Sequence, residues 1–102
     1  MDLGLHYWNF STPAGPQRIA DTLAAAAKTA EEAGFAEFNV MDHYFQIEQR
    51  ARAEEPMLEA YTTLGYVAAL TRRIRLAVLV ADAGDPPGRV GNRRWDCGPW
   101  RR

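Results

Sequence analysis

Residues 74–80, IRLAVLV, decide the fold that this sequence predicts. The stretch contains β-branched residues and is almost continuously apolar, which is typical of a strand buried on both faces of a parallel sheet. Parallel neighbours are joined by crossover connections that usually contain a helix. The stretch therefore predicts an α/β fold, and the residues before it should alternate between helix and strand.

Two strands and two helices are predicted upstream of this stretch. Residues 3–10 (LGLHYWNF) and residues 37–41 (EFNVM) are rich in aromatic and aliphatic side chains, so both are expected to be strands. Pro16 suits the first position of a helix, and Gly34 suits a left-handed cap at its end, followed by the hydrophobic contact of Phe35. A second helix is expected directly after Pro56, because two acidic residues precede this proline.

Each predicted helix has an apolar stripe, which should face the sheet. The stripe of the first helix consists of Ile19, Leu23, Ala26, Ala27 and Ala30. The stripe of the second helix consists of Met57, Tyr61, Leu64 and Ala68, and it is widened by Leu58, Gly65 and Ala69.

The resulting order, β-α-β-α-β, fits both a doubly wound sheet and a (β/α)8 barrel. The turn after the first strand reads FSTPAGPQ, which lacks the G-x-G-x-x-G fingerprint of dinucleotide-binding sheets, and the sequence has no Walker loop. We therefore predict the N-terminal β-α-β-α-β portion of a (β/α)8 TIM barrel, truncated after the third strand.

Residues 81–102 differ in character from the rest of the chain. They contain four of the eight glycines and three of the six prolines, and they carry a net charge of +2, whereas residues 1–80 carry −3. No helical or strand period is recognisable there. We therefore predict a partial barrel over residues 1–80 and an irregular Gly/Pro/Arg-rich tail over residues 81–102 that is not barrel sequence.

The composition excludes several classes of function. The net charge of −1 gives no electrostatic reason to expect nucleic acid or a membrane surface as partner. No apolar run approaches the roughly 18 residues of a membrane span, and the start, MDLGLHYWNF, does not resemble a secretion signal. A single cysteine and the lack of Cys/His zinc spacing predict a cytoplasmic protein without a metal site.

Asp42 and His43 are the candidate site residues, because chemistry in both architectures collects at the carboxyl ends of the strands. A long connection follows them, and long loops in compact domains are often functional. Histidine suits proton transfer near neutral pH. Two other interpretations stay open: Asp42 as the cap of a short helix starting at His43, and His6 as a residue that lines the core or contacts substrate.

The motif MDHYFQ, residues 41–46, precedes EPMLEAYTTLGYVAALTRRIRL, residues 55–76, at a characteristic spacing. Together they resemble the N-terminal part of the luciferase-like monooxygenase family, and more narrowly its coenzyme F420-dependent oxidoreductases. The stretches LGLHYWNF and AEEAGFAEFNVMDH match the same pattern, so the resemblance covers about residues 1 to 80.

The resemblance implies an oxidoreductase with a (β/α)8 barrel, a small-molecule substrate and a homodimeric assembly. The implied cofactor is F420, with FMN as the alternative. By position, His43 would be the catalytic residue, and Asp42 would lie beside the cofactor. Leu79 and Val80 would also contact the cofactor, at a strand end where the family often has a bulge with a cis peptide against the flavin ring.

A (β/α)8 barrel takes about 250 residues, so this chain is expected to hold only part of the cofactor site and to turn over little substrate alone. Two alternatives to the oxidoreductase remain. One is a small α/β interaction module whose Arg- and Trp-rich tail contacts a partner. The other is a nonfunctional translated fragment.

Overall fold

A computed structural model describes residues 2–43, 45–46 and 50–81, so the predicted tail lies almost wholly outside the described residues. The elements are β1 (Gly4–Tyr7), the 3-10 turn η1 (Pro16–Arg18), α1 (Ile19–Glu32), β2 (Glu37–Asp42), α2 (Ala60–Leu70) and β3 (Arg75–Ala81). The strands form one parallel sheet in the order β1-β2-β3. The predicted α/β fold is confirmed, with strands that start and end within a few residues of the expected positions.

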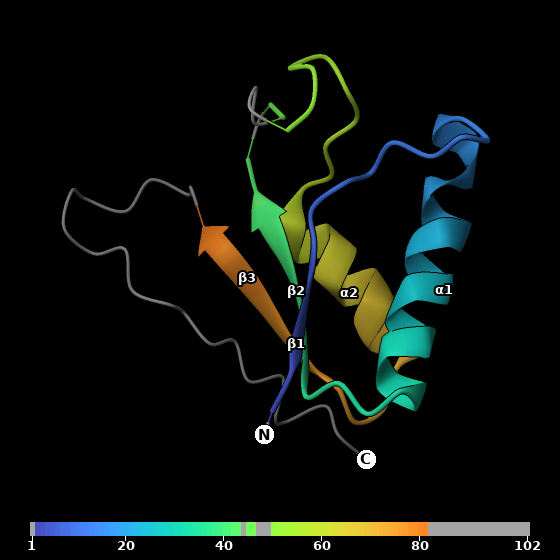
Figure 1. The fold of residues 1–102 in the computed structure, drawn as a ribbon, viewed down its shortest axis with the longest axis vertical. Coiled ribbons are helices and arrows are strands. Elements are labelled where there is room, and N and C mark those ends of the chain that lie inside the picture. The colour runs from blue at the N-terminus through green and yellow to red at the C-terminus, as the bar shows by residue number, and fades with distance from the viewer. Residues whose placement is uncertain (1, 44, 47–49, 82–102) are drawn as a thin grey trace, which may run out of the picture.

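Both α-helices cover the same face of the sheet, and the other face carries neither of them (Figure 1). The helices begin at the end of the sheet where the strands end, so the carboxyl ends of the strands and the amino ends of α1 and α2 lie at one edge. This is the arrangement of three consecutive strands in the wall of a (β/α)8 barrel.

The core lies between the sheet and the two helices. Successive strand residues point to opposite faces, so alternate residues of each strand meet the helices. The strand residues that pack in this core are Leu5, Tyr7, Phe38, Val40, Leu76 and Val78. On the opposite face, hereafter the open face, the register brings Gly4 beside Glu37 and Arg75, and His6 beside Asn39 and Ala77.

Helix α1 follows its predicted pattern closely. Ile19, Leu23, Ala27 and Ala30 are buried, and Ala26 packs against them partly buried. Gly34 adopts a φ of 84°, and the N–H of Phe35 donates to the carbonyl of Ala30 over 3.0 Å, as in a Schellman cap.

Helix α2 differs from the prediction in both its start and its buried face. It begins at Ala60 rather than after Pro56, because the carboxylate of Glu59 accepts the N–H groups of Tyr61 and Thr62 and so caps the helix there. Its buried residues are Ala60, Thr63, Leu64 and Val67, whereas Tyr61, Gly65, Ala68 and Ala69 of the predicted stripe are exposed. The helix is apolar on nearly all sides, so hydrophobic periodicity could not identify the buried face.

Glu31 connects α1 to the start of β3. Its carboxylate accepts the backbone N–H groups of Arg72, Arg73 and Ile74, at distances of 2.6 to 3.1 Å. Burial acts to raise the pKa of Glu31, but these three N–H groups and the charge of Arg73 together lower it. Separately, neither helix in the described part of the chain has the length and apolar character needed to cross a membrane.

Candidate functional site

The sequence-predicted site residues meet at the carboxyl ends of β2 and β3. Asp42 is the last residue of β2, and its partner in register is Ala81, the last residue of β3. Leu79 and Val80 come just before Ala81, and His43 directly follows Asp42. The structure therefore brings all four predicted residues to one edge of the sheet.

Asp42 is half-buried, and its Oδ1 accepts the N–H of Ala60 over 3.4 Å. Ala60 is the first residue of α2, so the carboxylate lies at the positive end of that helix dipole. The prediction that Asp42 caps a helix starting at His43 is wrong, because His43 is not helical. The carboxylate instead meets a helix that starts 18 residues later in the sequence.

His43 is half-buried just beyond the strand. Its position after the last residue of β2 places the imidazole ring at the same edge of the sheet as Asp42. A side chain there has one face toward the protein and another accessible to a small molecule, which a proton-transferring group requires.

A β-bulge interrupts the pairing of β2 with β3 at the predicted cofactor position. Val40 pairs with Val78 and Asp42 pairs with Ala81, so two residues, Leu79 and Val80, lie opposite Met41 alone. Bulges are rare between parallel strands and are over-represented beside active sites, because they break the ladder and redirect a strand end. Leu79 is 40% exposed, which leaves apolar surface at this edge.

Two loops at this edge are joined by side chains. Gln46, in the loop after β2, donates through Nε2 to the carbonyl of Trp8, in the loop after β1, over 3.2 Å. The guanidinium of Arg50 lies 5.6 Å from the centre of the Trp8 ring.

A second connection between these loops runs from the Ser11 hydroxyl, which donates to Glu55. This hydroxyl, followed by the N–H of Arg52, lowers the pKa of Glu55, so the acceptor stays ionised at neutral pH. Sequence reasoning interpreted Glu55 as an acid at a helix start, whereas it ties together two loops that are far apart in sequence.

Gln46 is a candidate site residue that sequence reasoning missed. Its side chain is 3% exposed, yet its Oε1 has no hydrogen-bond partner. A buried acceptor without a donor costs about 1–3 kcal/mol, so it calls for an explanation. The other buried unpartnered side-chain atom in the described ranges, Nε of Arg75, lies at the opposite end of β3. Only the position of Gln46, three residues after His43, signals its role in the sequence.

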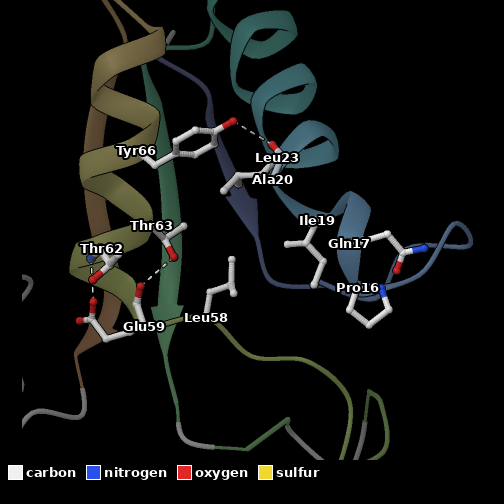
Figure 2. A pocket seen from close by; sticks show the side chains of 10 residues that line it. All are labelled: Pro16, Gln17, Ile19, Ala20, Leu23, Leu58, Glu59, Thr62, Thr63 and Tyr66. Atoms are coloured by element: carbon white, nitrogen blue, oxygen red, sulfur yellow. Dashed lines mark hydrogen bonds between the residues drawn. The ribbon is translucent and has the colours of Figure 1, made fainter.

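A groove of about 420 Å³ lies between the first turns of α1 and α2, on the helix-covered side of the sheet (Figure 2). In Figure 2, Tyr66 reaches from α2 toward α1, where its hydroxyl donates to the carbonyl of Ala20 over 3.3 Å. Glu59 is the one charged residue among those that line the groove, and its carboxylate already caps α2. The groove therefore has no free ionisable group for a reaction.

The described ranges contain no group of three or more His, Cys, Asp or Glu side chains that could hold a metal ion. What the edge of the sheet offers is a carboxylate, an imidazole, an unpartnered amide oxygen and an apolar strand bulge. These groups can bind an organic molecule with an apolar surface and polar edges, and one of them can exchange a proton with it.

Comparison with known proteins adds one result. The model of a family described as luciferase-like monooxygenase matches residues 3–87. The matched range includes the three strands, both α-helices and all the site residues named above. No curated protein and no solved structure matches the chain.

Proposed function

The chain belongs to the luciferase-like monooxygenase family, and from this premise we propose that it contributes to an oxidoreductase site with a flavin-type cofactor. The cofactor would lie against the carboxyl ends of β2 and β3. Coenzyme F420 is the proposed cofactor and FMN the alternative, because the MDHYFQ motif and its spacing resemble the F420-dependent members. The proposed setting is the cytoplasm, and the proposed partners are a small-molecule substrate and a second copy of the chain.

The bulge in β3 is the observation that carries this proposal. An extra residue opposite Met41 leaves peptide groups of Leu79 and Val80 outside the regular ladder. Their N–H and C=O groups can bind the polar edge of a flat ring, while exposed Leu79 offers the ring an apolar surface. Asp42 lies across from the end of the same bulge.

The unpartnered oxygen of Gln46 also fits such a cofactor. Flavins and deazaflavins carry a ring N–H between two carbonyl groups, and this N–H is a donor. A donor of this kind would satisfy Oε1 of Gln46, while Nε2 stays bonded to the carbonyl of Trp8. The residues present therefore fit the group that the family implies.

When bound, a flavin-type cofactor supplies hydride or oxygen chemistry at its ring. The side chains of this chain bind and orient. The side chain of Leu79 and the backbone of residues 79–80 would hold one side of the ring, and Asp42 fixes the loop that starts at His43 through its bond to the start of α2. His43 accepts or donates the proton that accompanies the reaction at the substrate.

Fluorescence titration of purified protein with F420 and with FMN tests the proposal. We expect quenching with a dissociation constant in the micromolar range for one of them, and a loss of roughly two- to tenfold in affinity for Gln46→Leu, since one hydrogen bond is removed. Gln17→Leu is the matched control, because Gln17 is exposed and its amide nitrogen donates only to the nearby carbonyl of Ala14; the affinity of this variant should be unchanged.

Circular dichroism during thermal unfolding separates the other outcomes. A chain that unfolds cooperatively but quenches neither cofactor would contradict the proposal and support the small interaction module. A chain without a cooperative transition would contradict it in favour of a nonfunctional fragment. Equal affinities for Gln46→Leu and Gln17→Leu would remove Gln46 from the site while leaving the family function intact.

A further inference from the structure

The open face of the sheet carries three hydrogen-bonded side chains that the proposed chemistry does not use. His6 on β1 and Asn39 on β2 are partners in register, and Glu37 lies two residues before Asn39 on the same face. His6 Nδ1 is 2.5 Å from Asn39 Oδ1, and Asn39 Nδ2 donates to Glu37 Oε1 over 3.3 Å. We call His6, Asn39 and Glu37 the His6 relay.

The direction of each hydrogen bond in the His6 relay follows from the chemistry of its ends. An ionised carboxylate only accepts, so the amide nitrogen of Asn39 must be the atom that faces Glu37. The amide oxygen of Asn39 then faces His6 and can only accept, so Nδ1 of His6 carries the proton. In the neutral ring the lone pair is consequently on Nε2, which becomes a hydrogen-bond acceptor.

The burial of the His6 relay shows which of its atoms is available to a ligand. Asn39 is 6% exposed in the central strand, where asparagine is uncommon and a polar group must be hydrogen-bonded. His6 is exposed, although its Nδ1 is held by Asn39. A buried amide thus fixes the orientation of an accessible imidazole, as an orienting residue does in many catalytic and binding sites.

The surroundings of His6 on the open face are small or apolar. Gly4 precedes it on the same face of β1, and Ala77 lies beyond Asn39 on β3. Toward the carboxyl edge, the next residues on this face are Met41 on β2 and Leu79 on β3. Asp42 lies three positions along the strand from Asn39, about 10 Å away. Met41 and Ala77 are buried, and Leu79 is 40% exposed, so Nε2 is one accessible acceptor on a face whose exposed apolar side chain nearest to the proposed site is Leu79.

We propose that Nε2 of His6 accepts a hydrogen bond from a hydroxyl group of the substrate, with Asn39 and Glu37 as its positioning residues. The inference rests on the proposed function, because it extends the same site along the open face. The substrate class is a molecule with a hydroxyl group.

Long-range 1H–15N spectra of the histidine rings test this at about pH 8.5, where an unperturbed imidazole is neutral. The chain has two histidines, so in the His43→Gln variant the remaining histidine signals are those of His6. We expect His6 to carry its proton on Nδ1 and to have an unprotonated Nε2. Cyclohexanol should shift the Nε2 signal, whereas cyclohexanone, which has the same size but no donor, should leave it in place.

Two variants test the positioning residues, with circular dichroism as the check on folding. Asn39→Ala should move the proton toward Nε2 and abolish the cyclohexanol shift, and Asn39→Asp should keep the proton on Nδ1, because a carboxylate still accepts from it. If Asn39→Ala does not fold, the inference is still tested in the His43→Gln chain by the tautomer of His6 and by the comparison of cyclohexanol with cyclohexanone.

A proton on Nε2 in the unmutated relay would overturn the inference. So would a bare Nε2 that responds equally to cyclohexanol and cyclohexanone, or to neither up to their solubility limits. A shift caused by F420 or FMN but not by cyclohexanol would also overturn it, since Nε2 would then bind the cofactor. Cofactor binding is measured separately by fluorescence, so failure of the proposed function and failure of this inference give different results.

Discussion

Replacing Glu31 by glutamine should destabilise the fold at a contact that connects the end of α1 to the start of β3. The carboxylate accepts N–H groups from Arg72 at 2.8 and 3.1 Å, from Arg73 at 2.6 Å and from Ile74 at 2.9 Å. Glutamine keeps one acceptor oxygen but loses the charge and the second oxygen. It therefore cannot hold all three N–H groups as the carboxylate does.

The size of the effect follows from the number and the exposure of these bonds. A hydrogen bond to a charged group contributes about 1.5–3 kcal/mol when buried. Glu31 is only half-buried, and the bonds to Arg72 and Arg73 are exposed, so solvent screening reduces each to about 0.5–1 kcal/mol. With one acceptor oxygen retained, Glu31→Gln should lower the free energy of unfolding by about 1–2 kcal/mol, or the Tm by roughly 5–10 °C.

The effect should depend on pH in one direction. The pKa of Glu31 is lowered below its ordinary value of 4.5 in the folded chain. The unfolded chain therefore binds a proton first as the pH falls, and the stabilisation by Glu31 is present above pH 4.5 and lost below it. The difference in the free energy of unfolding between the unmutated chain and Glu31→Gln should therefore shrink as the pH falls below 4.5.

Urea unfolding followed by circular dichroism at pH 7 and at a pH below 4 measures both effects. Glu32→Gln is the matched control, because Glu32 is the adjacent, exposed acid on the same helix and should cost less than about 0.5 kcal/mol. Equal unfolding free energies for the two variants at pH 7, or a difference that persists unchanged in acid, would refute the reasoning.

Three further predictions concern turns, caps and the proposed base. Gly34→Ala should lower the free energy of unfolding by about 1–2 kcal/mol, because Gly34 has a φ of 84°. Gly65→Ala within α2 should raise it by about 0.5–1 kcal/mol, since outside the helix's own backbone no atom lies within 4 Å of the added Cβ. Thermal unfolding of both variants checks these opposite signs. Glu59→Ala should destabilise α2 by about 0.5–2 kcal/mol without changing cofactor affinity, and a shift in the fluorescence titration would contradict its assignment as a cap alone. His43→Ala should lower any F420- or FMN-dependent turnover by about 10²–10⁴-fold, whereas an unchanged rate would exclude proton transfer by His43.

Elements with strong local signals could be predicted from the sequence. Residues 74–80 identified β3, and the spacing from Ile19 to Ala30 identified the buried face of α1. The Schellman cap at Gly34 also follows from local chemistry, because glycine tolerates its positive φ. These features depend on neighbours within a few residues.

Features that depend on contacts between distant residues could not be predicted. The bond from Asp42 to Ala60 determines where its carboxylate lies, but sequence reasoning considered only the next few residues. The buried face of α2 is selected by packing against the sheet, because an almost wholly apolar helix has no distinct stripe. The carboxylate of Glu31 lies on the polar side of α1 and gave no signal of its bonds to residues 72–74.

The three polar side chains Glu31, Asn39 and Gln46 differ in how completely the fold satisfies them, and this difference separates structural from functional roles. Glu31 uses its carboxylate on backbone N–H groups, so the effect of its replacement should not depend on added cofactor. Asn39 is satisfied by His6, which leaves Nε2 at the surface. Gln46 is half satisfied, and a marginally stable domain retains a cost of about 1–3 kcal/mol only where something offsets it. Gln46→Leu removes the unpartnered oxygen together with the bond from Nε2 to the carbonyl of Trp8, so the stability of the cofactor-free chain should change little, while cofactor should stabilise the variant less than it stabilises the unmutated chain. Unchanged stability without cofactor and reduced stabilisation with it would support a binding role for the unpartnered oxygen.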